Sequence, residues 1–197
     1  MRATGFLILL VGLAGCGPSE SQALAPQPAE AMPTRPLASL AVTSPDFVEG
    51  GTLALGNAHS VFGCVGSNRS PALEWEAVAG ARSYAVSLFD PDASGDGWWH
   101  WTVANIPGSV TTLAAGAGGR RGMLPPGAVQ GRTDFGSAGY GGPCPPVGDA
   151  PHRYVFTVYA LSVEDLAIDG ETDGTSFKAR AEAAAIATGQ ITARFGR

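Results

Sequence analysis

Lysine is almost absent from this chain of 197 residues: Lys178 is the single one, and 12 basic side chains stand against 17 acidic ones. Proteins that bind nucleic acid need clustered basic side chains to neutralise the backbone phosphates. The sequence contains no basic stripe of that kind, so we expect no nucleic-acid partner. Its formal net charge of −5 at pH 7 is that of an ordinary soluble surface.

An apolar run long enough to cross a membrane, about 20 residues, is also missing. The apolar stretch at residues 6–14 is shorter, follows Arg2 and ends at small residues in front of Cys16. This order is typical of a secretory signal peptide that closes with a lipobox. We therefore expect residues 1–15 to be a signal peptide and Cys16 to carry lipid, with ordinary cleavage and a free thiol as the alternative. Because Gly17 resembles the sorting pattern of outer-membrane lipoproteins, we expect an exported protein anchored in a membrane, most simply the outer one, and facing the periplasm.

Cysteine is scarce as well, with three residues in the whole chain. Lipidation would occupy Cys16, which leaves Cys64 and Cys144 in a compartment that permits disulfides. A bridge between them would close a loop of about 80 residues and contribute roughly 4 kcal/mol through chain entropy. Two unrelated buried thiols are the alternative. We favour the disulfide because both cysteines lie in loops rich in glycine and proline.

Apolar periodicity is absent from residues 16–40, which contain prolines at positions 18, 26, 28, 33 and 36. Such a segment cannot bury a core, so it predicts an extended tether. The remaining residues, 41–197, suffice for one domain with a hydrophobic core.

The pattern within this domain is mainly β. Its strand candidates are rich in Val, Trp, Tyr, Phe and Thr and are bounded by turn residues; they are Leu53–Leu55, Ala72–Val78, Ser83–Asp90, Trp98–Ile106 and Arg153–Leu161. Two of them, Ser83–Asp90 and Arg153–Leu161, are apolar on both faces. This predicts that they lie in the middle of a packed sheet or sandwich.

Helical patterns are confined to the last third of the domain. The alanine-rich stretch Phe177–Thr188 predicts a helix that is capped by Thr175 or Ser176 and ends at Gly189. A shorter helix is predicted near Ser162–Leu166.

Residues 114–152 follow neither strand nor helix periodicity. These 39 residues include eleven glycines and six prolines. A loop of this length within a compact domain is commonly functional or disordered. The prolines around Cys144 favour a stiff, ordered loop, which we interpret as functional.

Polar side chains occur where the predicted strands meet loops. Asp90 ends one strand, His100 lies in the tryptophan-rich strand, and His152 opens the strand that contains Tyr154. Residues two apart in a strand share a face, which places His152 with Tyr154 and His100 with Trp98. Imidazole and phenol groups donate hydrogen bonds to anions, and a carboxylate can fix a histidine tautomer. Together these residues predict a small polar pocket.

Each of these residues also has an ordinary structural interpretation. A histidine in an apolar strand is commonly a core residue bonded to a carbonyl group, and Asp90-Pro91-Asp92 after a strand is commonly a turn. The tryptophans suit a core. Spacing alone leaves the pocket and these structural roles equally open.

Several separated motifs resemble the phosphatidylethanolamine-binding protein (PEBP) family. Its first signature is similar to residues 90–93 (DPDA), 99–101 (WHW) and 105–107 (NIP). Its second signature is similar to residues 134–136 (DFG), 140–148 (YGGPCPPVG) and 152–154 (HRY). Residues 64–75 (CVGSNRSPALEW) resemble the bacterial branch that is often called Raf-kinase-inhibitor-like. The resemblance covers about residues 40–195, essentially the whole domain.

The resemblance implies a fold of two packed antiparallel sheets, a β-sandwich with one C-terminal helix beside a small pocket. It implies a pocket for phosphate-like anions and phosphorylated head groups, with no cofactor. Carried over position by position, the ligand-binding residues are Asp90, Asp92, Trp98, His100, Gly142, Pro145, Pro146, His152 and Tyr154. Among them Pro145 and Pro146 would form a wall, and Arg153 is expected to make a structural ion pair.

Two departures from the family pattern concern the surroundings of the pocket. Ser94 stands where a second proline is usual after the DPDA motif, which affects a turn. The C-terminal helix lacks the histidine-rich ending of many bacterial relatives, and the last residues are abbreviated. The helical wall of the pocket is therefore an open question at the level of sequence.

We expect a ligand-binding module and not an enzyme. The family includes inhibitors of kinases and serine proteases, so a protein partner is conceivable, although a cytosolic kinase does not suit an exported lipoprotein. One alternative is a metal-dependent hydrolase that uses His100, His152 and Asp90, but the chain has neither an HExxH nor a GxSxG motif. Another is a structural envelope lipoprotein with a vestigial pocket. If the histidines contact an anion, affinity should rise as pH falls through their titration range.

Overall fold

The structure is a computed structural model that describes residues 37–119 and 123–197. The expected signal peptide, the lipidated Cys16 and the tether as far as residue 36 lie outside these residues. The described part consists of two β-sheets and a single α-helix, which confirms the expected mainly β class. This helix is too short and too polar to cross a membrane.

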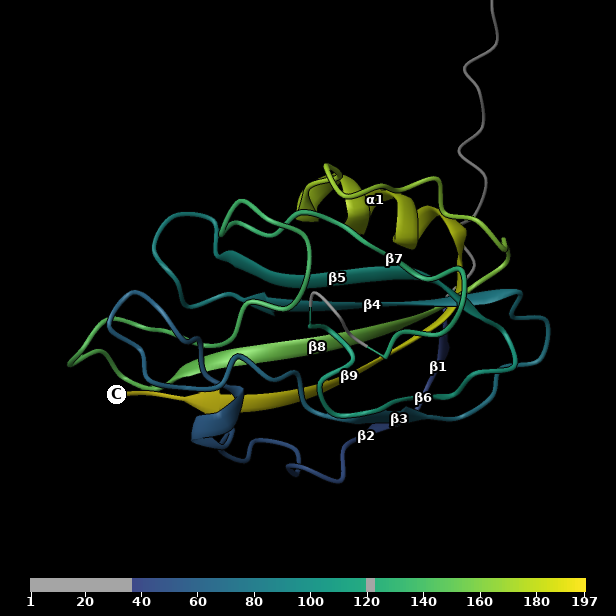
Figure 1. Cartoon of the computed structure of the whole chain (residues 1–197). Coiled ribbons are helices and arrows are strands. Elements are labelled where there is room, and N and C mark those ends of the chain that lie inside the picture. Colours follow the sequence, from purple (N-terminus) through teal and green to yellow (C-terminus); the bar gives the residue numbers. More distant parts are fainter. Residues whose placement is uncertain (1–36, 120–122) are drawn as a thin grey trace, which may run out of the picture. The chain divides into compact units, whose positions relative to one another are not determined.

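The larger sheet has six strands in the order β1-β9-β8-β4-β5-β7 (Figure 1). Their bounds are Ala38–Ser39 (β1), Ser83–Asp90 (β4), Trp98–Pro107 (β5), Val129–Gln130 (β7), His152–Leu161 (β8) and Ala185–Phe195 (β9). All neighbouring strands pair antiparallel except β1, a two-residue strand that runs parallel to β9. The long strands β4, β5, β8 and β9 therefore form the body of the sheet.

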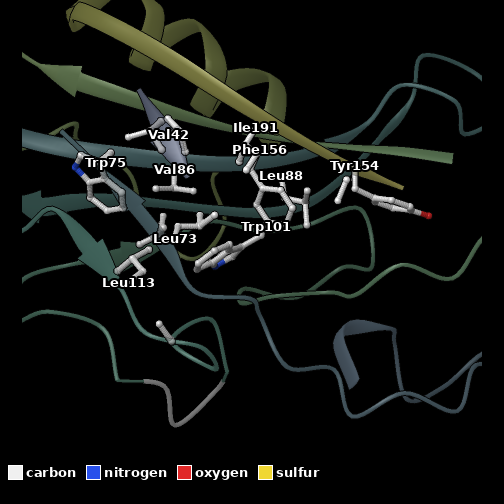
Figure 2. Packing of buried hydrophobic residues seen from close by; sticks show 14 of the residues in the cluster. Val42, Leu73, Trp75, Val86, Leu88, Trp101, Leu113, Tyr154, Phe156 and Ile191 are labelled. Carbon is white, nitrogen blue, oxygen red and sulfur yellow. The ribbon is translucent and has the colours of Figure 1, made fainter. Parts of the chain in front are cut away.

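The smaller sheet has three short antiparallel strands in the order β2-β3-β6. They are Val42–Thr43 (β2), Leu73–Trp75 (β3) and Thr112–Leu113 (β6). Their side chains pack against one face of the larger sheet, where Val86, Trp101 and Phe156 are completely buried (Figure 2). This interface is the main hydrophobic core.

The helix α1 (Gly174–Ala184) covers the opposite face of the larger sheet (Figure 1). Its Phe177 and Ala181 form a second apolar cluster with Ala85 of β4 and Tyr159 of β8. Because β4 and β8 are covered on both faces, both faces must be apolar. The predicted central position of these two strands is confirmed.

The helix ends earlier than the sequence predicted. Asp173 caps its first turn by accepting a hydrogen bond from the Ser176 amide, and the chain becomes extended at Ala185 and continues directly into β9. The prediction of a helix as far as Thr188 was wrong, and so was the interpretation of Gly189 as its end. Gly189 lies inside β9, where an added Cβ would be 1.8 Å from the carbonyl oxygen of Leu40. Glycine permits this close approach of two backbone segments.

Four further predictions differ from the structure. The strand predicted at Ala72–Val78 covers only Leu73–Trp75. Leu53–Leu55 is not a strand: the backbone there makes one bridge to β9, from Thr52, and then a 3-10 turn, η1 (Leu55–Asn57). The stretch Ser162–Leu166 contains no helix. The domain also starts before residue 41, since β1 pairs with β9 and Leu40 is buried.

Candidate ligand-binding site

Strand topology brings the predicted site residues to one edge of the larger sheet. Because β4 runs antiparallel to both of its neighbours, its carboxyl end lies beside the amino ends of β5 and β8. Asp90 pairs with Trp98 in the strand register, and Phe89 pairs with Val155. Residues that are far apart in sequence, Asp90, His100 and His152, thus meet at a single corner.

A cavity of about 270 Å³ opens at this corner. Seven of the predicted site residues line it, namely Asp90, Trp98, His100, Pro145, Pro146, His152 and Tyr154. Six others complete the lining, namely Phe62, Ala93, Ser94, Phe135, Cys144 and Asp149. No lining residue belongs to α1, so the expected helical wall of the pocket is absent from the described residues.

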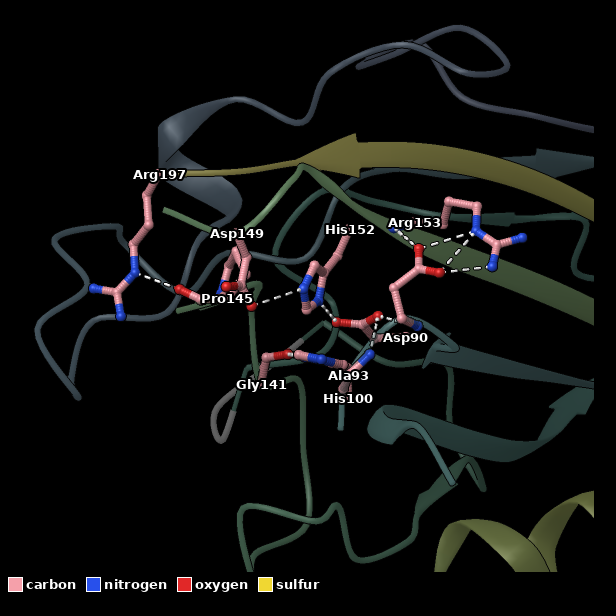
Figure 3. A network of polar contacts seen from close by, with 10 residues as sticks. Asp90, Ala93, His100, Gly141, Pro145, Asp149, His152, Arg153 and Arg197 are labelled. Atoms are coloured by element: carbon pink, nitrogen blue, oxygen red, sulfur yellow. Dashed lines mark hydrogen bonds and ion pairs between the residues drawn. The ribbon is translucent and has the colours of Figure 1, made fainter. Parts of the chain in front are cut away.

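Asp90 is the central acceptor of the site. Its side chain is 3% exposed, and one carboxylate oxygen accepts hydrogen bonds from the amides of Asp92 (2.9 Å) and Ala93 (3.1 Å). The other oxygen lies 2.8 Å from Nδ1 of His152 (Figure 3). Because three donors satisfy it, this carboxylate can remain buried. It also fixes the ring of His152 so that Nε2 is the nitrogen left for other partners.

His152 is held between two carboxylates. While Nδ1 contacts Asp90, Nε2 lies 3.6 Å from Oδ2 of Asp149 (Figure 3). Asp149 belongs to the loop between Pro146 and Pro151, and its side chain is 49% exposed. The imidazole therefore lies between the buried carboxylate of Asp90, which accepts three hydrogen bonds, and the partly solvated carboxylate of Asp149.

His100 is a neutral group in this pocket. Its Nδ1 lies 2.7 Å from the carbonyl oxygen of Gly141, and its ring meets those of Phe135 and Tyr154 edge-on. Burial lowers the pKa of His100 to about 4, although the Gly141 carbonyl and the charge of Asp90 act in the opposite direction. A neutral ring that donates from Nδ1 to a carbonyl leaves Nε2 as an acceptor. His100 thus contributes an acceptor and no charge at neutral pH.

Two buried donors of the cavity lining have no hydrogen-bond partner in the part of the chain that the structure describes. Four buried side-chain polar atoms lack a hydrogen bond among the described residues, and two of them are the Tyr154 hydroxyl and the Trp98 indole nitrogen. Figure 2 shows the Tyr154 hydroxyl pointing out of the apolar cluster. Burial, and then the nearby charge of Asp90, raise the pKa of Tyr154, so it remains a phenol that can donate.

Asp92 and Gly142, the other two predicted site residues, do not line the cavity. Asp92 accepts three hydrogen bonds from the guanidinium group of Arg153 and one from its backbone amide, and this pairing lowers the pKa of Asp92 to about 2. Gly142 is packed so tightly that a Cβ there would be 2.1 Å from the carbonyl oxygen of Asn57. Both residues thus have structural contacts outside the cavity, and Arg153 makes the ion pair that the sequence suggested.

The long loop forms one wall of the pocket and is anchored at several points. Cys64 and Cys144 form a disulfide with an S–S distance of 2.07 Å, as predicted. The guanidinium group of Arg197 binds the carbonyl oxygens of Pro145 and Gly63 (Figure 3). The C-terminal residue and the disulfide together fix the proline wall against the neighbouring loop.

The sequence analysis missed two aromatic residues and one acidic residue of the lining, namely Phe62, Phe135 and Asp149. Phe62 and Phe135 stack with ring centroids 5.9 Å apart, and Phe135 also meets Trp98 edge-on. Phe135 lies within the DFG motif, which was a usable signal. Phe62, in a glycine-rich loop, and Asp149 carry no local pattern that would have pointed to the pocket.

The comparison with known families decides the identity of this fold and site. A family model described as phosphatidylethanolamine-binding protein matches residues 43–196. The chain belongs to the phosphatidylethanolamine-binding protein family. The resemblance noted in the motifs is thereby confirmed, together with the two-sheet architecture that it implied.

Individual members of the PEBP family resemble the chain over most of its length. The UPF0098 protein YbcL of Escherichia coli is 50% identical over 158 residues, which cover 79% of this chain and 86% of that protein. A crystal structure of E. coli YbcL superimposes with a TM-score of 0.78 at 48% identity and covers 81% of this chain and 99% of the other. The putative lipoprotein LppC of Mycobacterium tuberculosis is 35% identical over 191 residues, which cover 92% of this chain and 89% of that protein.

Proposed function

We propose that this member of the PEBP family is an exported lipoprotein that binds a small anionic or phosphorylated ligand in the cavity at the corner of the larger sheet. The observation that carries the proposal is the pair of buried, unpartnered donors on Tyr154 and Trp98. An unsatisfied buried polar group costs about 1–3 kcal/mol. A ligand with acceptor oxygens would remove that cost for both groups.

The lining defines what kind of anion suits the cavity. Among the residues that the structure describes, it contains no lysine or arginine, so neutral donors and the imidazole of His152 would hold the oxygens. His100 offers an acceptor, which favours a ligand that also carries a proton, such as a singly protonated phosphate. Since His100 stays neutral above about pH 4, it would bring no positive charge to the anion at neutral pH.

Export and lipidation are supported by the N-terminal sequence. Residues 6–16 have the order of a signal peptide with a lipobox. The match to LppC covers 92% of this chain, so it extends well into the segment before residue 41. Gly17 is the reason to expect the outer membrane.

The alternative of a metal-dependent hydrolase has less support. Within residues 37–119 and 123–197, no three His, Cys, Asp or Glu side chains are grouped to hold a metal ion. One nitrogen of His152 faces Asp90 and the other faces Asp149, while Nδ1 of His100 faces a carbonyl. Stoichiometric zinc in the purified protein, lost on His100→Ala, would reverse this preference.

The test is a calorimetric titration of inorganic phosphate and of phosphoethanolamine into the wild type and into Tyr154→Phe, which measures the affinity of each protein for each compound. Loss of one hydrogen bond of about 0.5–1.5 kcal/mol predicts roughly two- to tenfold weaker binding. The ligand-free variant should be as stable as the wild type or slightly more so, because the removed hydroxyl has no partner among the described residues.

Tyr140→Phe is the matched control. Its hydroxyl donates to the Asn57 carbonyl at 3.0 Å and does not line the cavity. This variant should therefore lose about 1 kcal/mol of unfolding free energy and keep its affinity for the ligand. Equally weak binding of phosphate and phosphoethanolamine to the wild type and to Tyr154→Phe would indicate a vestigial pocket instead.

A further inference from the structure

The motif at residues 64–75 contains an asparagine, Asn68, that is not part of the cavity lining. Its backbone is left-handed, with φ 49°, a conformation that asparagine tolerates better than most residues. Both ends of its side-chain amide are bonded to the long loop. Nδ2 donates to the carbonyl oxygen of Tyr140 at 2.9 Å, and Oδ1 accepts from the amide of Gly142 at 2.7 Å. A single side chain thus holds the loop on both sides of Gly141.

Gly141, which lies between these two bonds, contacts His100 twice. Its amide donates to the backbone carbonyl oxygen of His100 at 2.8 Å, and its own carbonyl oxygen lies 2.7 Å from Nδ1 of the ring (Figure 3). Gly141 is buried, and an added Cβ would be 2.4 Å from the ring of Phe135. The segment is therefore closely packed on that side, while Asn68 bonds the residues that flank it.

The carbonyl of Gly141 determines which nitrogen of His100 carries the proton. In a neutral imidazole, the hydrogen bond that one nitrogen makes fixes the tautomer of the ring. The bond to a carbonyl requires the proton on Nδ1 and leaves Nε2 as an acceptor. The same loop segment also acts on the charge of the ring: burial lowers the pKa of His100, whereas the carbonyls of Gly141 and Gly142 act in the opposite direction.

We infer that Asn68 is a positioning residue, which sets the tautomer of His100 by holding the carbonyl of Gly141 in place. Because Asn68 is not part of the cavity lining, it would affect a ligand only through this loop segment and the ring. Its effect on affinity rests on the proposed function, in which Nε2 of His100 accepts a proton from a protonated phosphate. Its effect on the tautomer requires no ligand.

Asn105, near the other end of β5, provides a matched control. Its backbone is also left-handed, with φ 60°. Its side chain also makes two bonds to another loop: Nδ2 donates to the carboxylate of Asp165 at 3.0 Å, and Oδ1 accepts from the amide of Leu166 at 2.9 Å. Alanine at either position removes two hydrogen bonds and must adopt a left-handed backbone, but Asn105 has no bond to the loop segment that holds His100.

The experiment records nitrogen NMR signals of the histidine rings at pH 7, with His100→Asn to assign those of His100. In the wild type, Nδ1 should give the signal of a protonated nitrogen and Nε2 that of an unprotonated one. In Asn68→Ala the other tautomer should appear, because the carbonyl is no longer held against Nδ1. Inorganic phosphate should bind this variant roughly two- to tenfold more weakly, as for the loss of one hydrogen bond. Asn105→Ala should keep the wild-type tautomer and affinity even though its unfolding midpoint falls.

Asn68→Asp answers the question if the alanine variant does not fold. A carboxylate can still accept from the Gly142 amide but cannot donate to the Tyr140 carbonyl, so this variant should also show the second tautomer. An unchanged tautomer in the variants of Asn68 that fold, or the same change in Asn105→Ala, would overturn the inference and leave the proposed function intact. Failure of phosphate to bind the wild type would overturn the proposed function, while the ring signals would still decide whether Asn68 positions His100.

Discussion

At the scale of single residues, Asp90 organises the pocket, although three protein donors already bind its carboxylate. Its three hydrogen bonds connect the end of β4 to the start of β8. By fixing His152 through Nδ1, it determines which nitrogen a ligand meets. A buried carboxylate that loses such partners destabilises the folded protein. The stability of the local fold and the orientation of the imidazole therefore depend on the same hydrogen bonds.

His100 makes the stability of the protein depend on pH. Its pKa is about 4 in the folded protein and 6.5 in the unfolded chain, so the unfolded chain binds more protons between these values. The unfolding free energy therefore falls as pH decreases from about 6.5 to 4, and the contribution is fully present above 6.5. A difference of this size corresponds to roughly 3 kcal/mol.

His100→Asn isolates this contribution, because the amide nitrogen of asparagine can replace Nδ1 as the donor to the Gly141 carbonyl without titrating. Urea unfolding at pH 7 and at pH 4.5 should show a smaller loss of stability in the variant than in the wild type. All other titratable groups are common to both proteins. The difference between the loss of unfolding free energy in the wild type and that in the variant therefore reports the contribution of His100. Equal losses would show that His100 is not held neutral by the fold.

At the scale of elements, one wall of the pocket consists of two loops, which contain Cys64 and Cys144 and are joined covalently and by a backbone hydrogen bond. The disulfide joins Cys64 to Cys144, and the His59 amide donates to the Pro143 carbonyl beside it. Phe62 reaches the cavity from the first loop and Pro145 from the second. The relative position of the loops therefore sets the shape of the cavity.

Replacing both cysteines with alanine should destabilise the domain and weaken the pocket together. We expect a loss of about 2–4 kcal/mol of unfolding free energy, because the loop of 80 residues is no longer closed in the unfolded chain. Affinity for phosphoethanolamine should fall severalfold as the loops become less ordered. Urea unfolding and calorimetry measure the two effects, and the wild type under reducing agent should match the variant. An unchanged unfolding midpoint would contradict this role of the disulfide.

The elements also show what sequence could and could not predict. The strands β4, β5 and β8 were found to within one residue, because long apolar stretches on both faces and Asp or Pro at their ends leave little ambiguity. The strand β9 was mistaken for the end of a helix, because alanine favours helices locally and only pairing with β8 overrides that preference. Asp149 was missed for a similar reason: its relation to His152 exists only in three dimensions.

At the scale of the whole molecule, β9 separates the pocket from the point where the chain enters the domain. Ala187 and Thr188, near its start, pair with β1, while Phe195, near its end, pairs with His152 (Figure 1). The first residue that lines the cavity is Phe62. Ligand binding should therefore be independent of the N-terminal segment, and membrane attachment should be independent of the pocket.

Cys16→Ser tests this separation of roles. Cys16 lies outside the described residues, and the prediction rests on the lipobox order of residues 6–16. In the wild type, mass spectrometry of the mature protein should show an acylated N-terminal cysteine, and the protein should partition with membranes. The variant should appear in the soluble fraction and bind phosphoethanolamine with unchanged affinity. The variant without Cys64 and Cys144 is the control and should remain with the membranes, since the lipid alone provides the attachment. Retention of the Cys16→Ser protein in the membrane fraction would mean that a protein surface, and not the lipid, holds it there.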